Sequence, residues 1–438
     1  MSQVFKINGI DYEFECELSN SDNQKISFTK SSIRGMTIID NIFDPFSSGS
    51  VSIANPYDYI ENEYLLRGDG RDKMSIKFKP VDGKDSVEFN QKFVIINDST
   101  SGTASVRSEN IKTFALIHED AIRFSDQTPY NKSYSGKIGK ILRDIFIEVL
   151  GEDRVDKDNW EDGELELTYS APLSYRYVDM IHYLMRIYYA KDGDLNVKGF
   201  INLDHKKNKY NLILLSKTFS DNSKLLLEAF SLGDLTHNIQ TSNPNNPPPE
   251  AKTSEYIAQI KNVGYSTPLY AWNNDFFVNS LVFGYDHISG IHSIRKLKIL
   301  DIKDKWKTKF VDVFKSLGGK PKPFVITNNS TNKKFKQYRL PYNINDNVGI
   351  VEAELYNALT FYNLHCVFRN IGNSDRDSGK FIDIYKTNDT LLKSDEKLLG
   401  RWFITEIRHI FYGDIYHNEF LCTKTYVGPN SNSKLDVT

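Results

Sequence analysis

Apolar and polar side chains alternate in short runs along the first part of the chain, the pattern of strands with one buried face. Residues 26–29, 51–54 and 74–78 follow this alternation. Turn-forming residues separate the runs, most clearly at residues 44–50, where Asp, Pro, Ser and Gly gather. Short strands at close spacing are typical of a barrel or sandwich, so we expect a β domain over residues 1–125.

The period changes after residue 125, where apolar residues recur three and four positions apart. Residues 138–150 place Ile, Leu, Phe and Val on one helix face, and Ser135 and Gly151 stand at its two ends. A helix is therefore expected there, within an α+β insert over residues 126–237. The other elements that we expect in this insert are a helix at residues 174–189 and a β-hairpin at residues 195–203 and 210–215.

Residues 238–254 contain three consecutive prolines, which cannot join a sheet ladder and which favour an extended backbone. This segment is predicted to be a linker between domains. The remaining parts that we expect are an intermediate α+β region at residues 255–345, a second β domain at residues 346–428 that can include strands from residues 255–300, and a flexible tail at residues 429–438.

Composition narrows the function classes. The chain has 438 residues, enough for two to four domains. Aromatic residues make up 13% of it, with 27 Phe and 25 Tyr, which favours pleated, half-buried surfaces. The 55 Lys and Arg nearly balance the 57 Asp and Glu, and a formal net charge of -2 argues against a dedicated nucleic-acid binder. No apolar stretch approaches the ~18 residues of a membrane-spanning helix, so no membrane anchoring is expected.

The residues that carry most enzyme chemistry are scattered. Cys16, Cys366 and Cys422 form no CxxC pair, which excludes zinc ribbons and thioredoxin-like sites. His287 and His292 stand five apart without the HExxH pattern of metallopeptidases. The sequence also lacks a nucleophile elbow and a dinucleotide fingerprint. We therefore expect a protein that is not an enzyme and that holds no metal or cofactor.

Four local motifs could be taken for catalytic or binding sites, but each is better interpreted as an ordinary structural element. The acidic clusters at residues 161–166 and 375–377 lie beside glycines and are interpreted as solvated loops. The Gly- and Lys-bearing residues 135–140 lack phosphate-loop spacing and are interpreted as the start of a helix. The Arg-Gly-Asp triplet at residues 67–69 is interpreted as a turn.

Two stretches near the ends of the chain carry a recognisable order of strands and turns. Residues 33–53 give a strand, an acidic turn and a Gly-bearing strand, and residues 65–76 give a Leu-Leu-Arg-Gly-Asp turn before the next strand. Residues 401–411 give an aromatic strand with a His, which reverses into a Tyr-led strand at residues 416–423. Together they resemble the baseplate central hub protein of contractile-tailed phages. The structural positions that this resemblance marks are Asp40, Pro45, Gly49, Gly68, Trp402, His409 and Tyr416.

The resemblance implies a mainly β fold with an α+β insert, in which two tube-like β-barrel domains share one chain. Three chains would form a homotrimeric ring of six barrels, which joins the six-fold tail tube to the three-fold spike. DNA would pass through the lumen without specific binding, and we expect few Lys or Arg there because each neutralised phosphate strengthens binding. The implied partners are tube, spike and surrounding baseplate proteins. The implied location is the virion, after synthesis in the host cytoplasm.

Several alternatives stay open. A hub module of a related contractile injection system, of the type VI secretion kind, has a similar order of elements. A β-rich carbohydrate-active enzyme or an adhesin would also show alternating Val, Ile and Phe with Gly and Pro turns. The aromatic residues that could anchor an interface, or that fill a barrel core instead, are Tyr270, Trp272, Phe276 and Phe277.

Overall fold

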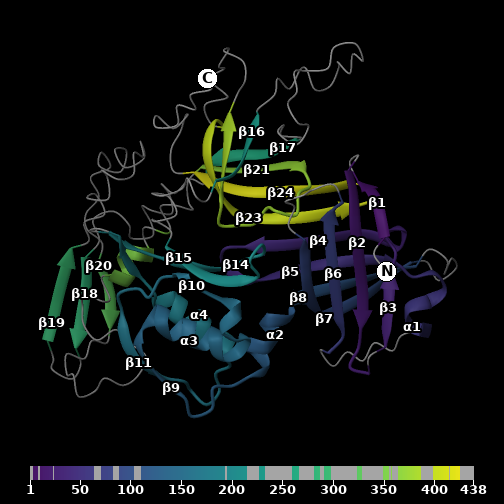
Figure 1. The fold of residues 1–438 in the computed structure, drawn as a ribbon. Coiled ribbons are helices and arrows are strands. Elements are labelled where there is room, and N and C mark those ends of the chain that lie inside the picture. Colours follow the sequence, from purple (N-terminus) through teal and green to yellow (C-terminus); the bar gives the residue numbers. More distant parts are fainter. Residues whose placement is uncertain are drawn as a thin grey trace.

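The computed structural model shows a mainly β chain with a helical insert (Figure 1). It describes residues 3–7, 10–22, 24–63, 71–81, 88–102, 110–192, 195–214, 226–231, 259–265, 281–286, 291–296, 323–327, 349–354, 357, 364–385, 398–413 and 415–424. None of the helices in these ranges is long and apolar enough to cross a membrane.

The N-terminal part is a run of antiparallel strands with two short helices. The sheet order is β1-β2-β6-β7-β8-β5-β4, with β3 paired to β2. Alternating buried and half-exposed residues along β4 and β8 show one face turned to a core. The bounds are β1 Gln3–Ile7, β2 Ile10–Ser19, β3 Lys25–Phe28, β4 Ile33–Asn41, β5 Asp44–Ala54, α1 Tyr59–Glu63, β6 Lys73–Pro80, β7 Phe89–Ser101, β8 Ile111–His118 and α2 Glu119–Asp126.

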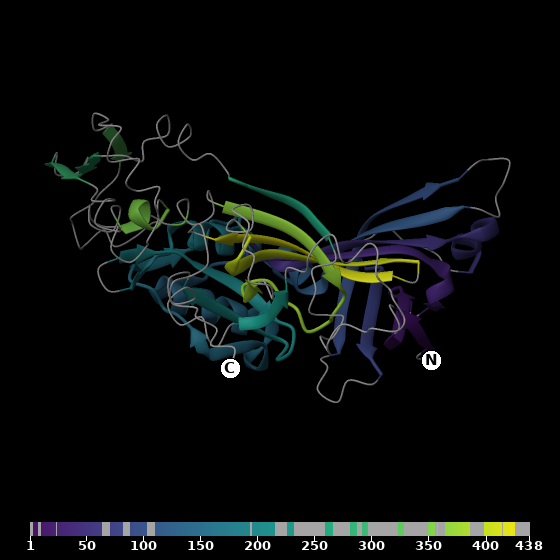
Figure 2. The same ribbon diagram turned by 90° about the horizontal axis from the view of Figure 1, so that it is seen from above.

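The C-terminal strands continue the same sheet. β23 pairs with β24 on one side and with β4 on the other, where the register runs from Glu406 opposite Asn41 to Tyr412 opposite Gly35. A single 14-stranded sheet therefore contains strands from both ends of the sequence, which the two views show as adjoining purple and yellow strands (Figures 1 and 2). The bounds are β16 Leu226–Ser231, β17 Gln259–Tyr265, β21 Leu364–Ile371, β22 Phe381–Tyr385, β23 Gly400–Tyr412 and β24 Ile415–Lys424.

Each part of the sheet has its own hydrophobic core. One core gathers residues of the N-terminal strands, such as Phe14, Val51 and Phe114. Another gathers residues of the C-terminal strands, such as Phe368 and Trp402. Phe411 and Tyr416 belong to the first core although they lie on β23 and β24, so the cores meet at the shared strands.

The insert packs its two longer helices over small sheets. The apolar stripe of α3 (Ile138–Leu150) is buried, and Gly151 ends the helix with a positive φ of 101°. Gly139 on α3 has no room for a side chain, because a Cβ there would lie 2.1 Å from the carbonyl oxygen of Glu161. The other elements are β9 Ser133–Lys137, β10 Val155–Trp160, β11 Glu166–Ser170, α4 Tyr177–Ile187, β12 Ala190–Asp192, β13 Leu195–Val197, β14 Gly199–Asp204 and β15 Lys209–Leu214.

A third group of strands forms its own sheet. β18 (Leu281–Asp286) pairs with β19 (Ile291–Lys296) and with β20 (Pro323–Thr327). Residues 349–354 are helical, as expected for the start of the fourth region.

The expected mainly β fold with an α+β insert is confirmed, with local corrections. The second insert helix is shorter than expected, and α2 was not predicted although His118 caps it and its apolar side is buried. The paired strands β9 and β11 were not predicted, and α3 begins at Ile138, within the helix start expected at residues 135–140. The domain limits stay a prediction. The parts of the sequence prediction that fall outside the described residues are the triplet at 67–69, the linker at 238–254, the four aromatic residues from Tyr270 to Phe277, and the tail at 429–438.

Candidate functional site: a buried polar junction and a sheet face of paired charges

Two of the predicted motif residues meet on the inner side of the shared strands. His409 on β23 accepts hydrogen bonds at Nδ1 from the hydroxyl of Tyr416, at 2.7 Å, and from Nδ2 of Asn418, at 3.0 Å. Burial, together with the nearby His205, lowers the pKa of His409 to about 3. A neutral ring is the form that can accept at Nδ1, so the contact of His409 with Tyr416 and Asn418 is structural.

The third motif residue in this region, Asp40 on β4, meets the insert. The turn between β14 and β15 carries His205, whose Nε2 lies 3.7 Å from an oxygen of Asp40 and 3.9 Å from one of Asp377. The side-chain amide of Gln91 lies against Nδ1 of the same ring. Burial lowers the pKa of His205, but the carboxylates of Asp377 and Asp40 outweigh burial and raise it above its ordinary value. The raised pKa favours the protonated form of His205, and this side chain joins the insert to both parts of the sheet.

The loop between β21 and β22 completes this junction. The backbone N–H of Ser378 donates to Asp40 at 2.9 Å, and Nη1 of Arg376 donates to Asn418 at 2.9 Å. Lys380 pairs with Asp377 at 2.5 Å. Arg376 is 1% exposed and Asp377 is 2% exposed, so the solvated loop expected at residues 375–377 is wrong. Partners on distant strands make burial of these charges possible, which the local pattern does not reveal.

The other acidic cluster, at residues 161–166, is also only partly solvated. Gly163 is buried with a positive φ of 78°, and a Cβ there would lie 2.7 Å from the ring of Tyr188. Leu165 is buried, while Glu164 is exposed. The interpretation as a solvated loop is wrong for this part because the loop packs against α3 and the end of α4.

The remaining motif residues have separate structural roles. Trp402 is buried on β23 and donates from Nε1 to the carbonyl of Leu398 at 2.7 Å. Gly49 lets β5 approach β4, since a Cβ there would lie 2.4 Å from the carbonyl oxygen of Thr37. Pro45 is the second residue of β5, so the turn expected at residues 44–50 is wrong: that stretch is strand, and the turn lies at residues 42–43. Gly68 lies outside the described residues.

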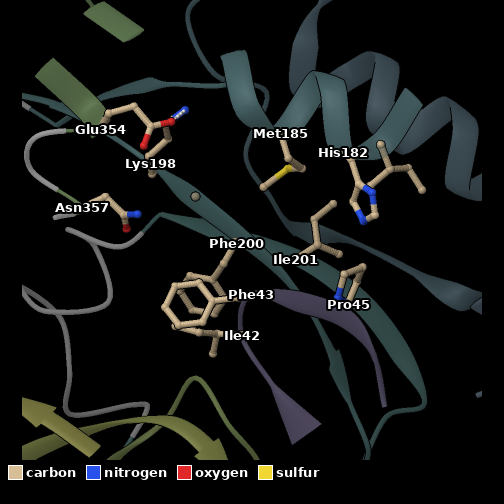
Figure 3. A pocket seen from close by; sticks show the side chains of 12 residues that line it. Ile42, Phe43, Pro45, His182, Met185, Lys198, Phe200, Ile201, Glu354 and Asn357 are labelled. Carbon is tan, nitrogen blue, oxygen red and sulfur yellow. Dashed lines mark ion pairs between the residues drawn. The ribbon is translucent and has the colours of Figure 1, made fainter. Parts of the chain in front are cut away.

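Pro45 borders a cavity of about 180 Å³ between the insert and the sheet turn. Figure 3 shows apolar side chains from α4, β14 and the turn around this space, with an ion pair at one side. In that pair Nζ of Lys198 lies 2.9 Å from Glu354. Phe43, 61% exposed, stands beside the cavity. The cavity lies at a seam between packed elements.

The opposite face of the shared sheet carries charges in pairs. Arg369 on β21, Glu419 on β24 and Arg408 on β23 stand opposite one another in neighbouring strands. We call the following set the paired-charge strip: Lys261, Arg369, Arg408, Glu406 and Glu419. On β4, β5 and β8 the same face continues with partly exposed Thr37, Ser50, Ser52, Ile39 and Thr113.

Within the described ranges no group of three His, Cys, Asp or Glu side chains could hold a metal ion. Cys366 and Cys422 are buried and free, as expected for small apolar core residues, and burial raises the pKa of the Cys366 thiol to about 12. A thiol with a raised pKa carries little of the reactive thiolate form.

Comparison with known proteins shows which solved structures share this fold. No protein-family model matches the chain, and no curated protein sequence matches it. The tail protein from Neisseria meningitidis MC58 has 8% identity and a TM-score of 0.51, over 94% of this chain and 99% of the other. The 43 kDa tail protein of prophage MuSo2 from Shewanella oneidensis has 9% identity and a TM-score of 0.50, over 94% and 98%. A Francisella PdpA–VgrG complex, in its lidded form, gives 9% identity and a TM-score of 0.48, over 96% and 53%.

The chain therefore has the fold of phage tail proteins along nearly its whole length. The resemblance seen in the sequence is confirmed at the level of the fold.

Proposed function

We propose that this chain is the structural hub of a contractile phage-tail baseplate. Three copies form a ring that joins the six-fold tail tube to the three-fold spike and that encloses the DNA channel. One observation carries the proposal: strands from both ends of the chain form a single sheet through the β4–β23 pair, in a fold that matches solved phage tail proteins.

The two cores support the symmetry argument. Each part of the sheet buries its own apolar residues, so one chain offers two β units joined side by side. Three copies related by a three-fold axis would present six such units. Closed cyclic assemblies are the common form of soluble homo-oligomers, and a ring of six units matches a six-fold tube on one side.

The shared outer face suits the wall of a DNA channel. Its residues on β4, β5 and β8 are small or apolar. The hydroxyl oxygens of Ser52 and Thr113 are 2.9 Å apart and form a hydrogen bond with each other. The cations on β21 and β23 are paired with glutamates. A wall of this kind neutralises few phosphates, so DNA moves past it without being held.

The insert offers surfaces for other baseplate proteins. Tyr130 and Leu173 expose most of their side chains on the loops around α3 and α4. Exposed Tyr and Leu side chains of this kind serve as contact residues for a protein partner. The function needs no catalysis, and the expected location is the tail of the virion.

Native mass measurement tests the assembly. One chain weighs 50.4 kDa, so a trimer weighs about 151 kDa. We expect the trimer alone or after addition of a spike protein. A monomer at every concentration, with and without the spike protein, would overturn the proposal.

A further inference from the structure

The paired-charge strip has an unusual balance of charge. Three cations, Lys261, Arg369 and Arg408, lie around two carboxylates. Each cation is partly exposed, and Arg408 exposes 44% of its side chain. The glutamate at the centre, Glu419, exposes only 7%. The side chains that reach the surface are thus the positive ones, although the strip contains acids.

Glu419 is the centre of the contacts. One of its oxygens pairs with Lys261 and lies 2.8 Å from Nε of Arg369, and the other lies 3.3 Å from Nη1 of Arg408. The second carboxylate, Glu406, holds Nε of Arg408 at 2.6 Å and accepts from Nδ2 of Asn41 at 2.9 Å. Nε and Nη1 of Arg408 are therefore both paired with carboxylates.

These contacts keep Glu419 ionised. Burial raises its pKa, but hydrogen bonds from Lys261 and Arg369 outweigh burial and hold the pKa below its ordinary value. Opposite charges directly across neighbouring strands stabilise a sheet, and this row runs over β21, β24 and β23.

We propose that Glu419 and Glu406 screen a cationic strip that would otherwise hold a nucleic-acid backbone. Guanidinium groups bind carboxylates and phosphates with the same donors, so a cation already paired with glutamate has fewer donors for a phosphate. The inference rests on the proposed function, in which this face of the sheet lines the DNA channel. The screening matters there because every phosphate contact slows the passage of DNA.

The screening can be removed one charge at a time. With both glutamates the strip has a net charge of one positive unit, from three cations and two carboxylates. Glu419→Gln raises this to two positive units, and the double variant with Glu406→Gln raises it to three. Glutamine keeps the size of the side chain, and its amide oxygen can still accept a hydrogen bond.

Binding of a fluorescently labelled DNA duplex, followed by anisotropy in low salt, measures the effect. We expect the double variant to bind at least about 10-fold more tightly than the unchanged chain, since two or three phosphate contacts become available. The logarithm of its binding constant should fall with the logarithm of salt by a slope steeper by about 2. Circular dichroism verifies that each variant is folded.

A matched control removes one carboxylate elsewhere. Glu17→Gln breaks the exposed pair of Lys25 and Glu17, at 2.8 Å, and changes the net charge of the chain by the same amount as Glu419→Gln. This control should bind DNA no better than the unchanged chain. Adding Arg369→Gln and Arg408→Gln to Glu419→Gln should abolish the gained binding.

Two results would overturn the inference. One is an unchanged chain that already binds DNA as tightly as the double variant. The other is a folded double variant that binds no better than the Glu17 control. Both results concern the chain in any oligomeric state, so they are distinguishable from a failure to form the ring, which the native mass reports.

Discussion

Replacing His205 by glutamine removes the charged group at the centre of the buried junction. Asp40 and Asp377 would then face each other with Lys380 as the nearest cation, paired with Asp377 at 2.5 Å. Loss of one partner from a buried ion pair costs about 3 kcal/mol or more, because the remaining charge keeps its desolvation cost without its partner. We expect His205→Gln to lower the free energy of unfolding by about that amount at about pH 6.

The effect depends on pH in a defined direction. The folded-state pKa of His205 is raised, so its stabilising contribution is complete below the unfolded value of about 6.5 and is lost as the pH rises through the folded value. The groups that face His205 are Asp40 on β4, Gln91 on β7, His118 at the end of β8, Asp377 and Lys380 in the β21–β22 loop, and His409 on β23. The difference between the unchanged chain and the variant reports the contribution of His205 together with its coupling to Asp40, Asp377 and His409, whose pKa values depend on the charge of His205.

Urea unfolding followed by tryptophan fluorescence measures this difference at about pH 6 and about pH 9. The urea midpoints of the unchanged chain and of the His205→Gln variant should lie far apart at about pH 6 and approach each other at about pH 9. Lys207→Gln is the matched control, since it breaks an ion pair with Asp156 at 3.0 Å on the surface beside the same turn. This control substitution should lower the free energy of unfolding by less than about 1 kcal/mol. A His205 variant that costs no more than this control at about pH 6, or whose cost is the same at about pH 9 as at about pH 6, would refute the reasoning.

Two further variants test other parts of the shared sheet. Gly49→Ala places a Cβ 2.4 Å from the backbone oxygen of Thr37, and backbone atoms of paired strands cannot move apart cheaply. We expect a lower urea midpoint than in the unchanged chain, and an equal midpoint would contradict the close approach. Lys424→Met replaces a buried amine whose pKa burial lowers to about 7. Because the unfolded state then binds more protons between pH ~7 and ~10, this lysine makes stability rise with pH over that range, and the Met variant should lack that rise.

The sequence predicted the elements whose residues repeat with a clear period. The stripe from Ile138 to Leu150 predicted α3 within the expected bounds, and the reversal expected between residues 411 and 416 is the β23–β24 hairpin. Local spacing contains this information, because one face of a helix or a strand is buried along its whole length.

The junction could not be predicted in the same way. The resemblance to baseplate hub proteins marked Asp40, His409 and Tyr416 as structural positions. Nothing in their spacing indicated that His205 would join them from the insert. Arg376 and Asp377 follow a strand in a polar stretch and carry the local signal of a solvated loop. Their burial depends on Asn418 and Lys380 and on a strand order that connects both ends of the chain. The pairing of β21 with β24 brings Asn418 to this loop, and the pairing of β4 with β23 brings Asp40 to the same junction.

Electron microscopy of the purified chain, alone and with a spike protein, tests the central claim most directly. We expect a closed ring of three chains with a six-fold-like outline and an open centre, and with the paired-charge strip on the channel wall. A compact monomer under both conditions, or a ring whose outer surface carries the strip, would contradict this account.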